Sequence, residues 1–156
     1  MKSSTYISGL ILFLFLNFGG LGIGSIWTTP GVISDWYLSL DNAPWRPPGW
    51  VFGFAWTTIG VTFSMLMAYN YMKKDIEPLL FFIPSLALNI LWNIIFFELH
   101  WLWFGVGILI SLSTLIFTII DFNRYVYGWK VALWGLPYFV WLMIALSINI
   151  YIAIQN

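Results

Sequence analysis

Residues 79–120 read LLFFIPSLALNILWNIIFFELHWLWFGVGILISLSTLIFTII, and Glu98 is the only Asp, Glu, Lys or Arg among them. On either side of Glu98, Leu79–Phe97 and Trp101–Ile120 approach the roughly 20 apolar residues that a helix needs to cross a hydrocarbon core of about 30 Å. Backbone groups in lipid must be paired within their own segment, so both stretches are predicted to be helices. Glu98–His100 then forms a tight hairpin between them.

The rest of the sequence has the same pattern, with short clusters of charged residues separated by long uncharged stretches. We predict five membrane-spanning helices, at Tyr6–Ile26, Gly49–Tyr71, Leu79–Phe97, Trp101–Ile120 and Val131–Ile154. The predicted fold class is therefore all-α, an integral membrane bundle of five transmembrane helices. Residues 1–156 form a single domain in this prediction.

The composition excludes several classes of protein. The chain is 61% hydrophobic and 8% charged, whereas about a quarter of the residues are charged in an ordinary soluble domain. The formal net charge is zero and basic residues form no patch, which argues against a nucleic-acid partner. The absence of cysteine excludes disulfides and thiolate-ligated metals, and we predict no metal site.

Basic residues are distributed unequally between the two sides of the predicted bundle. Five spans place Lys2, Lys73, Lys74, Arg124 and Lys130 on one side and leave only Arg46 on the other. The positive-inside rule then predicts a cytoplasmic N-terminus and a C-terminus on the opposite side. That opposite side also carries the longest connection, Trp27–Pro48, which is a candidate lid.

The chain contains eleven Trp, and their depth divides them into two groups. Trp27, Trp36, Trp101, Trp103 and Trp129 lie at the ends of predicted helices, as expected for an aromatic belt at the membrane interface. Trp56, Trp92 and Trp141 lie well inside predicted spans, where lipid offers no acceptor for an indole N–H. We expect these three indoles to face the bundle, either as core packing or as ligand contacts.

Three predicted helices combine aromatic side chains with small or amide side chains on one face. These faces consist of Asn89, Trp92, Asn93 and Phe96; of Tyr138, Trp141, Ala145 and Asn149; and of Gly53, Trp56 and Gly60. The amides either bond to neighbouring helices or supply polar groups to an aromatic pocket. No predicted span carries a carboxylate or a lysine, so a pocket for a flat apolar ligand is favoured over an ion path.

Residues 42–53, NAPWRPPGWVFG, follow Trp36-Tyr37 and precede Trp56. This segment resembles the first loop and second helix of the TspO/MBR family, the translocator or tryptophan-rich sensory proteins. The resemblance spans nearly the whole chain, because it continues through Ala87-Leu88-Asn89, Trp92, Asn93 and Ile95-Phe96-Phe97, and then through Pro137-Tyr138, Trp141, Ala145 and Asn149.

The resemblance implies a five-helix bundle, often a homodimer, that binds protoporphyrin-type tetrapyrroles, sterols or drug-like molecules in a cavity under the first loop. The tetrapyrrole is a ligand, and no cofactor is required. Carried over by position, Tyr37 and Pro47 resemble lid contacts, and Trp141 resembles the indole that faces the bound ring. Trp56, Asn89, Trp92, Asn93 and Ala145 resemble the pocket wall, to which the helical stripe adds Tyr138.

Three classes of function remain open. The first is a membrane sensor or translocator for tetrapyrroles and other flat apolar ligands. The second is an enzyme of light-dependent porphyrin degradation, in which Trp56 and Trp141 would be the catalytic residues. The third is a membrane scaffold without ligand chemistry.

Sterol binding is doubtful, because the family's sterol motif needs a base soon after a Tyr and none follows Tyr151. A pattern of that kind occurs at Leu66, Tyr69 and Lys73, but such motifs are weak indicators. His100 is a lone histidine in a hairpin, which favours an interfacial position over haem ligation.

A homodimer is predicted from the resemblance together with residues that permit close helix approach, which are Gly20, Gly24, Ser85 and Ala87.

Overall fold

The computed structural model describes residues 2–156, and these residues form helices and no β-strand. Within residues 2–156, five helical segments are long and apolar enough to cross a membrane, which confirms the all-α bundle. The segments are α1 (Lys2–Gly31), α3 (Gly49–Lys73), α4 (Ile76–Asn93) with the π-helical turn η1 (Ile94–Glu98), α5 (Leu102–Tyr127), and the run of α6 (Trp129–Ala132), η2 (Leu133–Gly135) and α7 (Leu136–Gln155).

Several helices extend beyond the predicted spans. Helix α1 ends at Gly31 instead of Ile26, and α5 continues to Tyr127 instead of Ile120. A charged residue ends the stretch of a helix that can face hydrocarbon, but it does not end the helix. In α5, for example, Asp121 and Arg124 form a 2.6 Å ion pair on the helix surface. The connection predicted at Trp27–Pro48 therefore begins after Gly31, and it contains the short helix α2 (Asp35–Ser39).

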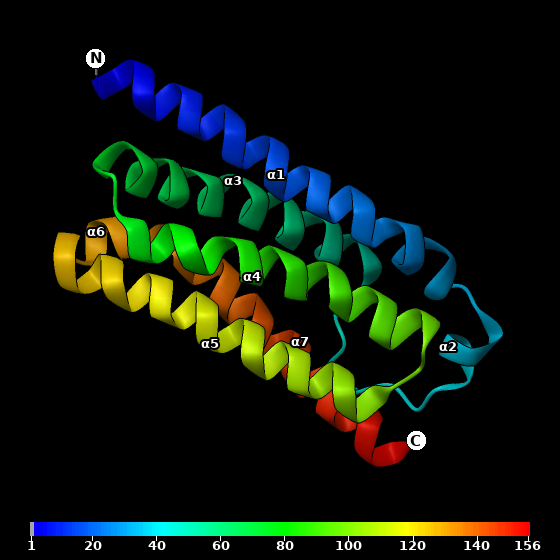
Figure 1. Ribbon diagram of the computed structural model, residues 1–156. Helices are drawn as coiled ribbons and strands as arrows, with labels where there is room; N and C mark the ends of the chain where they lie inside the picture. The colour runs from blue at the N-terminus through cyan, green and yellow to red at the C-terminus, as the bar shows by residue number, and fades with distance from the viewer. Residues whose placement is uncertain (1) are drawn as a thin grey trace.

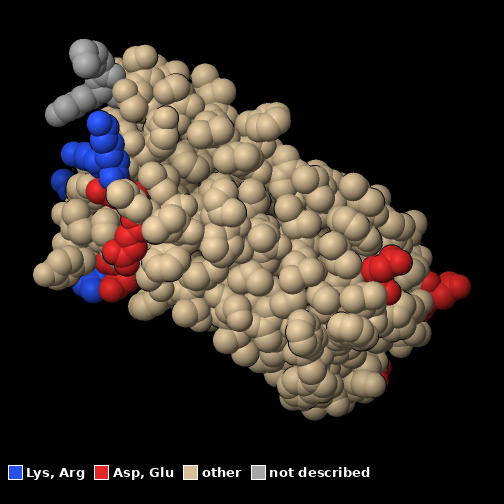
Figure 2. Space-filling view, viewed as in Figure 1, with Lys and Arg blue, Asp and Glu red and all other residues tan. Residues whose placement is uncertain are grey.

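The helices run roughly along one direction, with α1 on the outer edge of the bundle (Figure 1). Helix α1 packs on α3 and α4, while α5 lies between α4 and α7. The N-terminus and the turn between α3 and α4 lie at one end, and α2 and the C-terminus lie at the other (Figure 1). On the face shown in Figure 2, charged residues gather at the two ends and leave the middle uncharged. This distribution is the one that a lipid bilayer requires.

Glycines, which have no Cβ, allow α1 to approach α4 closely. A Cβ at Gly20 would lie 2.5 Å from Cδ1 of Leu86, and one at Gly24 would lie 2.8 Å from Nδ2 of Asn93. The close approach expected at these glycines thus occurs between helices of the same chain. Ser85 is also buried inside the bundle, whereas Ala87 is exposed on α4.

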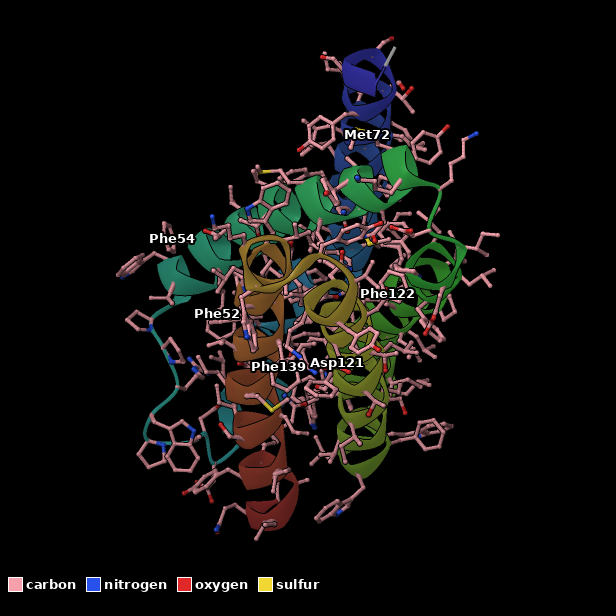
Figure 3. All side chains as sticks on the ribbon, turned by 90° about the vertical axis from the view of Figure 1, so that its left-hand side faces the viewer. Phe52, Phe54, Met72, Asp121, Phe122 and Phe139 are labelled. Carbon is pink, nitrogen blue, oxygen red and sulfur yellow. The ribbon has the colours of Figure 1, made fainter. Side chains whose placement is uncertain are left out.

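Aromatic side chains divide between the lipid-facing surface and the interior. Trp101, Trp103 and Trp129 are exposed near helix ends, as expected for a belt. Within α3, Phe54 points away from the bundle, whereas Phe52 lies beside α7 (Figure 3). The ring of Phe52 meets that of Trp141 edge to face at 5.0 Å.

Candidate functional site

A cavity of about 250 Å³ lies between α1, α3, α4, α5 and α7. The first helix contributes more of its wall than the sequence predicts. The lining residues are Leu21, Gly24, Ser25, Thr28, Val32, Phe52, Trp56, Asn89, Trp92, Asn93, Phe97, Leu109, Leu112, Trp141, Leu142, Ala145, Ile148 and Asn149. None of them is charged, so the cavity suits an apolar ligand with few polar groups.

Most of the predicted ligand-binding residues lie on this wall, namely Trp56, Asn89, Trp92, Asn93, Trp141 and Ala145. Tyr138 lies instead on the wall of a smaller neighbouring cavity, because it is one helical turn deeper in α7 than Trp141. Tyr37 and Pro47 line neither of these two cavities. Both belong to the connection between α1 and α3, outside the space that the helices enclose.

The amide side chains join helices and also face the cavity. Nδ2 of Asn89 donates to Oη of Tyr138 at 2.9 Å, and Nε1 of Trp92 donates to Oδ1 of Asn149 at 3.2 Å. These two hydrogen bonds connect α4 to α7. Both readings of the amides, as interhelical bonds and as pocket wall, therefore describe the same residues.

Asn93 connects α4 to α1 in the same way. Its Oδ1 accepts a hydrogen bond from Oγ1 of Thr28, and its Nδ2 donates to the backbone oxygen of Asn89. The amide is thus held at both ends while it lines the cavity. Helix α1 is thereby held against the cavity although most of its surface is exposed.

The indoles of Trp56 and Trp141 form an aromatic corner of the cavity. Their ring centroids are 6.5 Å apart with nearly perpendicular planes. Neither Nε1 donates a hydrogen bond to another group within residues 2–156, and Oδ1 of Asn89 accepts none there. The wall therefore offers two N–H donors and an amide oxygen to a ligand.

The connection of residues 32–48, the candidate lid, packs on the cavity wall from outside. The ring of Tyr37 packs on Phe97, which lines the cavity, at 5.6 Å between centroids. Nη1 of Arg46 donates to Oη of Tyr37 and to Oδ1 of Asn42, each at 3.0 Å. Arg46 thus fastens the beginning and the end of the lid to one another.

Two tryptophans anchor the candidate lid, one by ring stacking and one by a hydrogen bond. The indole of Trp36 stacks on the imidazole of His100 with ring centroids 3.7 Å apart. Further along, Nε1 of Trp45 donates to Oγ of Ser147 on α7 at 3.1 Å. The candidate lid therefore connects the hairpin between α4 and α5 with the C-terminal half of α7.

Sequence reasoning missed Thr28, Phe52 and Phe97 as wall residues. Each lies four residues from a wall residue on the same helix, since Thr28 follows Gly24, Phe52 precedes Trp56 and Phe97 follows Asn93. The helical period thus carried a signal for Phe52 and Phe97, next to the predicted residues Trp56 and Asn93, but none for Thr28, because Gly24 was not predicted to line the pocket. After Asn93 the helix continues as the π-helical turn η1, which has more residues per turn than an α-helix. Within η1, Phe97 faces the cavity and Phe96 packs on Trp36.

The described residues contain no group of three or more His, Cys, Asp or Glu side chains placed to hold a metal. The uncharged wall also supplies no side chain suited to general acid or base catalysis.

Comparisons with known proteins identify relatives that match most of the chain. The chain is 30% identical over 141 residues to the tryptophan-rich protein TspO of Archaeoglobus fulgidus, which covers 87% of this chain and 90% of that protein. It is 33% identical over 120 residues to protein CrtK of Rhodobacter capsulatus, covering 73% and 74% of the two chains. The translocator protein of Bos taurus is 32% identical over 68 residues, or 40% of each chain. The model of the TspO/MBR family matches residues 11–155, and the chain therefore belongs to the TspO/MBR family.

Proposed function

We propose that this membrane protein binds a protoporphyrin-type tetrapyrrole or a similar flat apolar ligand, and acts as a sensor or translocator for it. The observation that carries this proposal is the uncharged cavity whose wall combines the indoles of Trp56 and Trp141 with the amides of Asn89 and Asn93. Aromatic faces stack on a flat ring, and the few polar groups orient it. The names of the relatives, tryptophan-rich and translocator proteins, support the same class of function.

The cavity size suggests how such a ligand sits. Its volume of about 250 Å³ is near the lower end of ligand sites, which run from about 300 to 1,000 Å³. A tetrapyrrole would therefore occupy the cavity with one part of its ring and extend through an opening. Ser25 and Val32 line the cavity and are exposed, so the opening lies beside α1.

Titration of the protein in lipid nanodiscs with protoporphyrin tests the proposal through quenching of Trp fluorescence. We expect saturable quenching, and Ala145→Phe should weaken it at least tenfold because the new ring fills the cavity. Val140→Phe is the matched control, since Val140 is 54% exposed on the same helix. Absence of saturable quenching in the unsubstituted protein would contradict the proposal and favour the scaffold function.

A second candidate function is light-dependent porphyrin degradation. The contact between Trp56 and Trp141 favours it, because a photoexcited ring bound beside two adjoining indoles could exchange an electron with them. Illumination of the complex, with and without oxygen, followed by absorption spectroscopy distinguishes the two functions. Loss of porphyrin that needs both indoles would support the enzyme, whereas binding without loss would support the sensor or translocator.

A further inference from the structure

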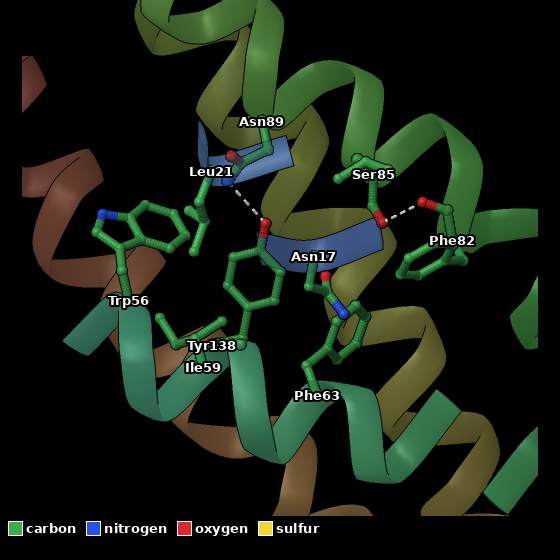
Figure 4. A pocket seen from close by; sticks show the side chains of 11 residues that line it. Asn17, Leu21, Trp56, Ile59, Phe63, Phe82, Ser85, Asn89 and Tyr138 are labelled. Carbon is green, nitrogen blue, oxygen red and sulfur yellow. Dashed lines mark hydrogen bonds between the residues drawn. The ribbon is translucent and has the colours of Figure 1, made fainter. Parts of the chain in front are cut away.

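A second cavity of about 20 Å³ lies beside the ligand cavity, between α1, α3, α4 and α7 (Figure 4). Leu21, Trp56 and Asn89 line both cavities and separate them. Although this second cavity is small, several of the side chains on its wall are polar. The oxygens of Asn17, Ser85 and Tyr138 point toward the same space (Figure 4).

Two of these residues have acceptors to spare. Nδ2 of Asn17 donates to Oγ of Ser64 at 2.8 Å, which leaves Oδ1 of Asn17 as an acceptor. Oγ of Ser85 donates to the backbone oxygen of Phe82 at 2.7 Å, which leaves its lone pairs as acceptors.

Tyr138 has a donor to spare. Its Oη accepts a hydrogen bond from Nδ2 of Asn89, and its O–H finds no acceptor among residues 2–156. Tyr138 is only 5% exposed, so bulk water does not satisfy this hydroxyl. A buried O–H donor without an acceptor is destabilising, and neighbouring lipid offers no alternative acceptor.

A cavity holds a water molecule when it has about 10–15 Å³ of room and two to four polar partners. The volume of about 20 Å³ suits a single water. We propose that this cavity is the binding site of one buried water, which accepts from Tyr138 O–H and donates to Asn17 Oδ1 and Ser85 Oγ. All three spare groups are then paired, and the water links α1, α4 and α7.

The water also determines which polar atom Asn89 presents to the ligand cavity, a consequence that rests on the proposed function. Because Tyr138 donates to the water, it accepts from Asn89, and Oδ1 of Asn89 faces the ligand as an acceptor. Without the water, the phenol would donate to Asn89 and the amide would present N–H instead. The site therefore favours a ligand that has an N–H or O–H donor at Asn89.

A crystal structure of the protein at about 2 Å or better in a lipid phase is the direct test. We expect a density peak within hydrogen-bonding distance of the oxygens of Tyr138, Ser85 and Asn17. A featureless cavity would overturn the proposal. Neither result depends on a ligand, so the test separates failure of the water site from failure of the proposed ligand.

Thermal unfolding of Ser85→Val, with Ser113→Val as the control, is an independent test. Both serines are buried and donate to their own helix backbone, but Ser113 lies on α5 and lines neither cavity. Valine at Ser85 would displace the water and leave Tyr138 and Asn17 unpaired, so its midpoint should fall several degrees below that of the control. An equal or higher midpoint for Ser85→Val would mean that its methyl groups fill a dry space, which overturns the proposal.

Discussion

At the level of single residues, Trp141 combines burial with an unused polar group. It is 5% exposed, its ring meets those of Phe52 and Trp56, and it lines the ligand cavity. Packing alone accounts for the burial but leaves the indole N–H without an acceptor. A ligand contact accounts for both observations.

We predict that Trp141→Phe lowers porphyrin affinity or photodegradation several-fold while the folded protein persists. Phenylalanine keeps an aromatic ring but loses the N–H, and Trp56→Phe should behave similarly. Trp101→Phe is the control, because Trp101 is 55% exposed near a helix end. Fluorescence titration and thermal unfolding measured together check the prediction.

A purely structural Trp141 would give a different result. The substitution would then cost about 1–3 kcal/mol of stability through altered packing and leave the ligand response of the folded fraction unchanged. Equal ligand responses in all three variants would contradict the pocket assignment.

At the level of elements, the position of α1 depends on small residues that face α4. A Cβ at Gly24 would meet Nδ2 of Asn93 at 2.8 Å, close to the hydrogen bond between Asn93 and Thr28. The helix that closes one side of the cavity is thus held by a contact that only glycine permits.

Gly24→Ala is therefore expected to destabilise the protein by about 1–3 kcal/mol, as overpacking usually does, and to weaken ligand binding by displacing Asn93. The matched control is Gly22→Ala on the same helix, since no atom lies within 4 Å of its added Cβ. Thermal unfolding in detergent measures the difference. Equal stability of the two variants would show that α1 adjusts without strain.

The candidate lid, residues 32–48, is a second element, and one side chain in it contacts two others. Arg46 donates to both Tyr37 and Asn42, and its guanidinium lies 5.4 Å from the Tyr37 ring. We predict that Arg46→Leu loosens residues 32–48, so that limited proteolysis of this connection and ligand dissociation both become faster. Lys74→Leu, at the opposite end of the bundle, is the control and should leave both rates unchanged.

At the level of the whole molecule, basic residues predict the orientation. Five lie on the side of the N-terminus and only Arg46 lies on the other. We expect a reporter fused to the C-terminus to be active only outside the cytoplasm, and one fused to the N-terminus to be active only inside it. A cytoplasmic C-terminus would mean that the positive-inside rule does not govern this protein.

Association of two copies is the second prediction at this scale. Gly20 and Gly24 face the interior and Ser85 is buried, so Ala87 on the outer face of α4 is the member of the predicted set that remains exposed for close helix contact. The chain has no cysteine, so Ala87→Cys introduces a single thiol. We expect it to form disulfide-linked dimers in lipid, whereas Val140→Cys on α7 should remain monomeric. Monomer alone for both variants would argue against a dimer through this face.

The sequence alone determined the five spans, because charge-free runs of this length have few alternatives in a bilayer. It also identified the faces that contain Asn89, Trp92 and Trp141, because the helical period is a local property. The predicted helix ends were less accurate, since a charged residue such as Asp121 marks the edge of the hydrocarbon-facing stretch but does not end the helix.

Only the tertiary structure decided which of these faces meet, and at which depth. It assigned Gly24 and Thr28 of α1 to the ligand cavity and Tyr138 to the smaller cavity, and it left Tyr37 and Pro47 outside both. The rotation and depth of each helix follow from contacts between residues far apart in the chain, such as that of Thr28 with Asn93. The period of a single helix contains no information about such contacts.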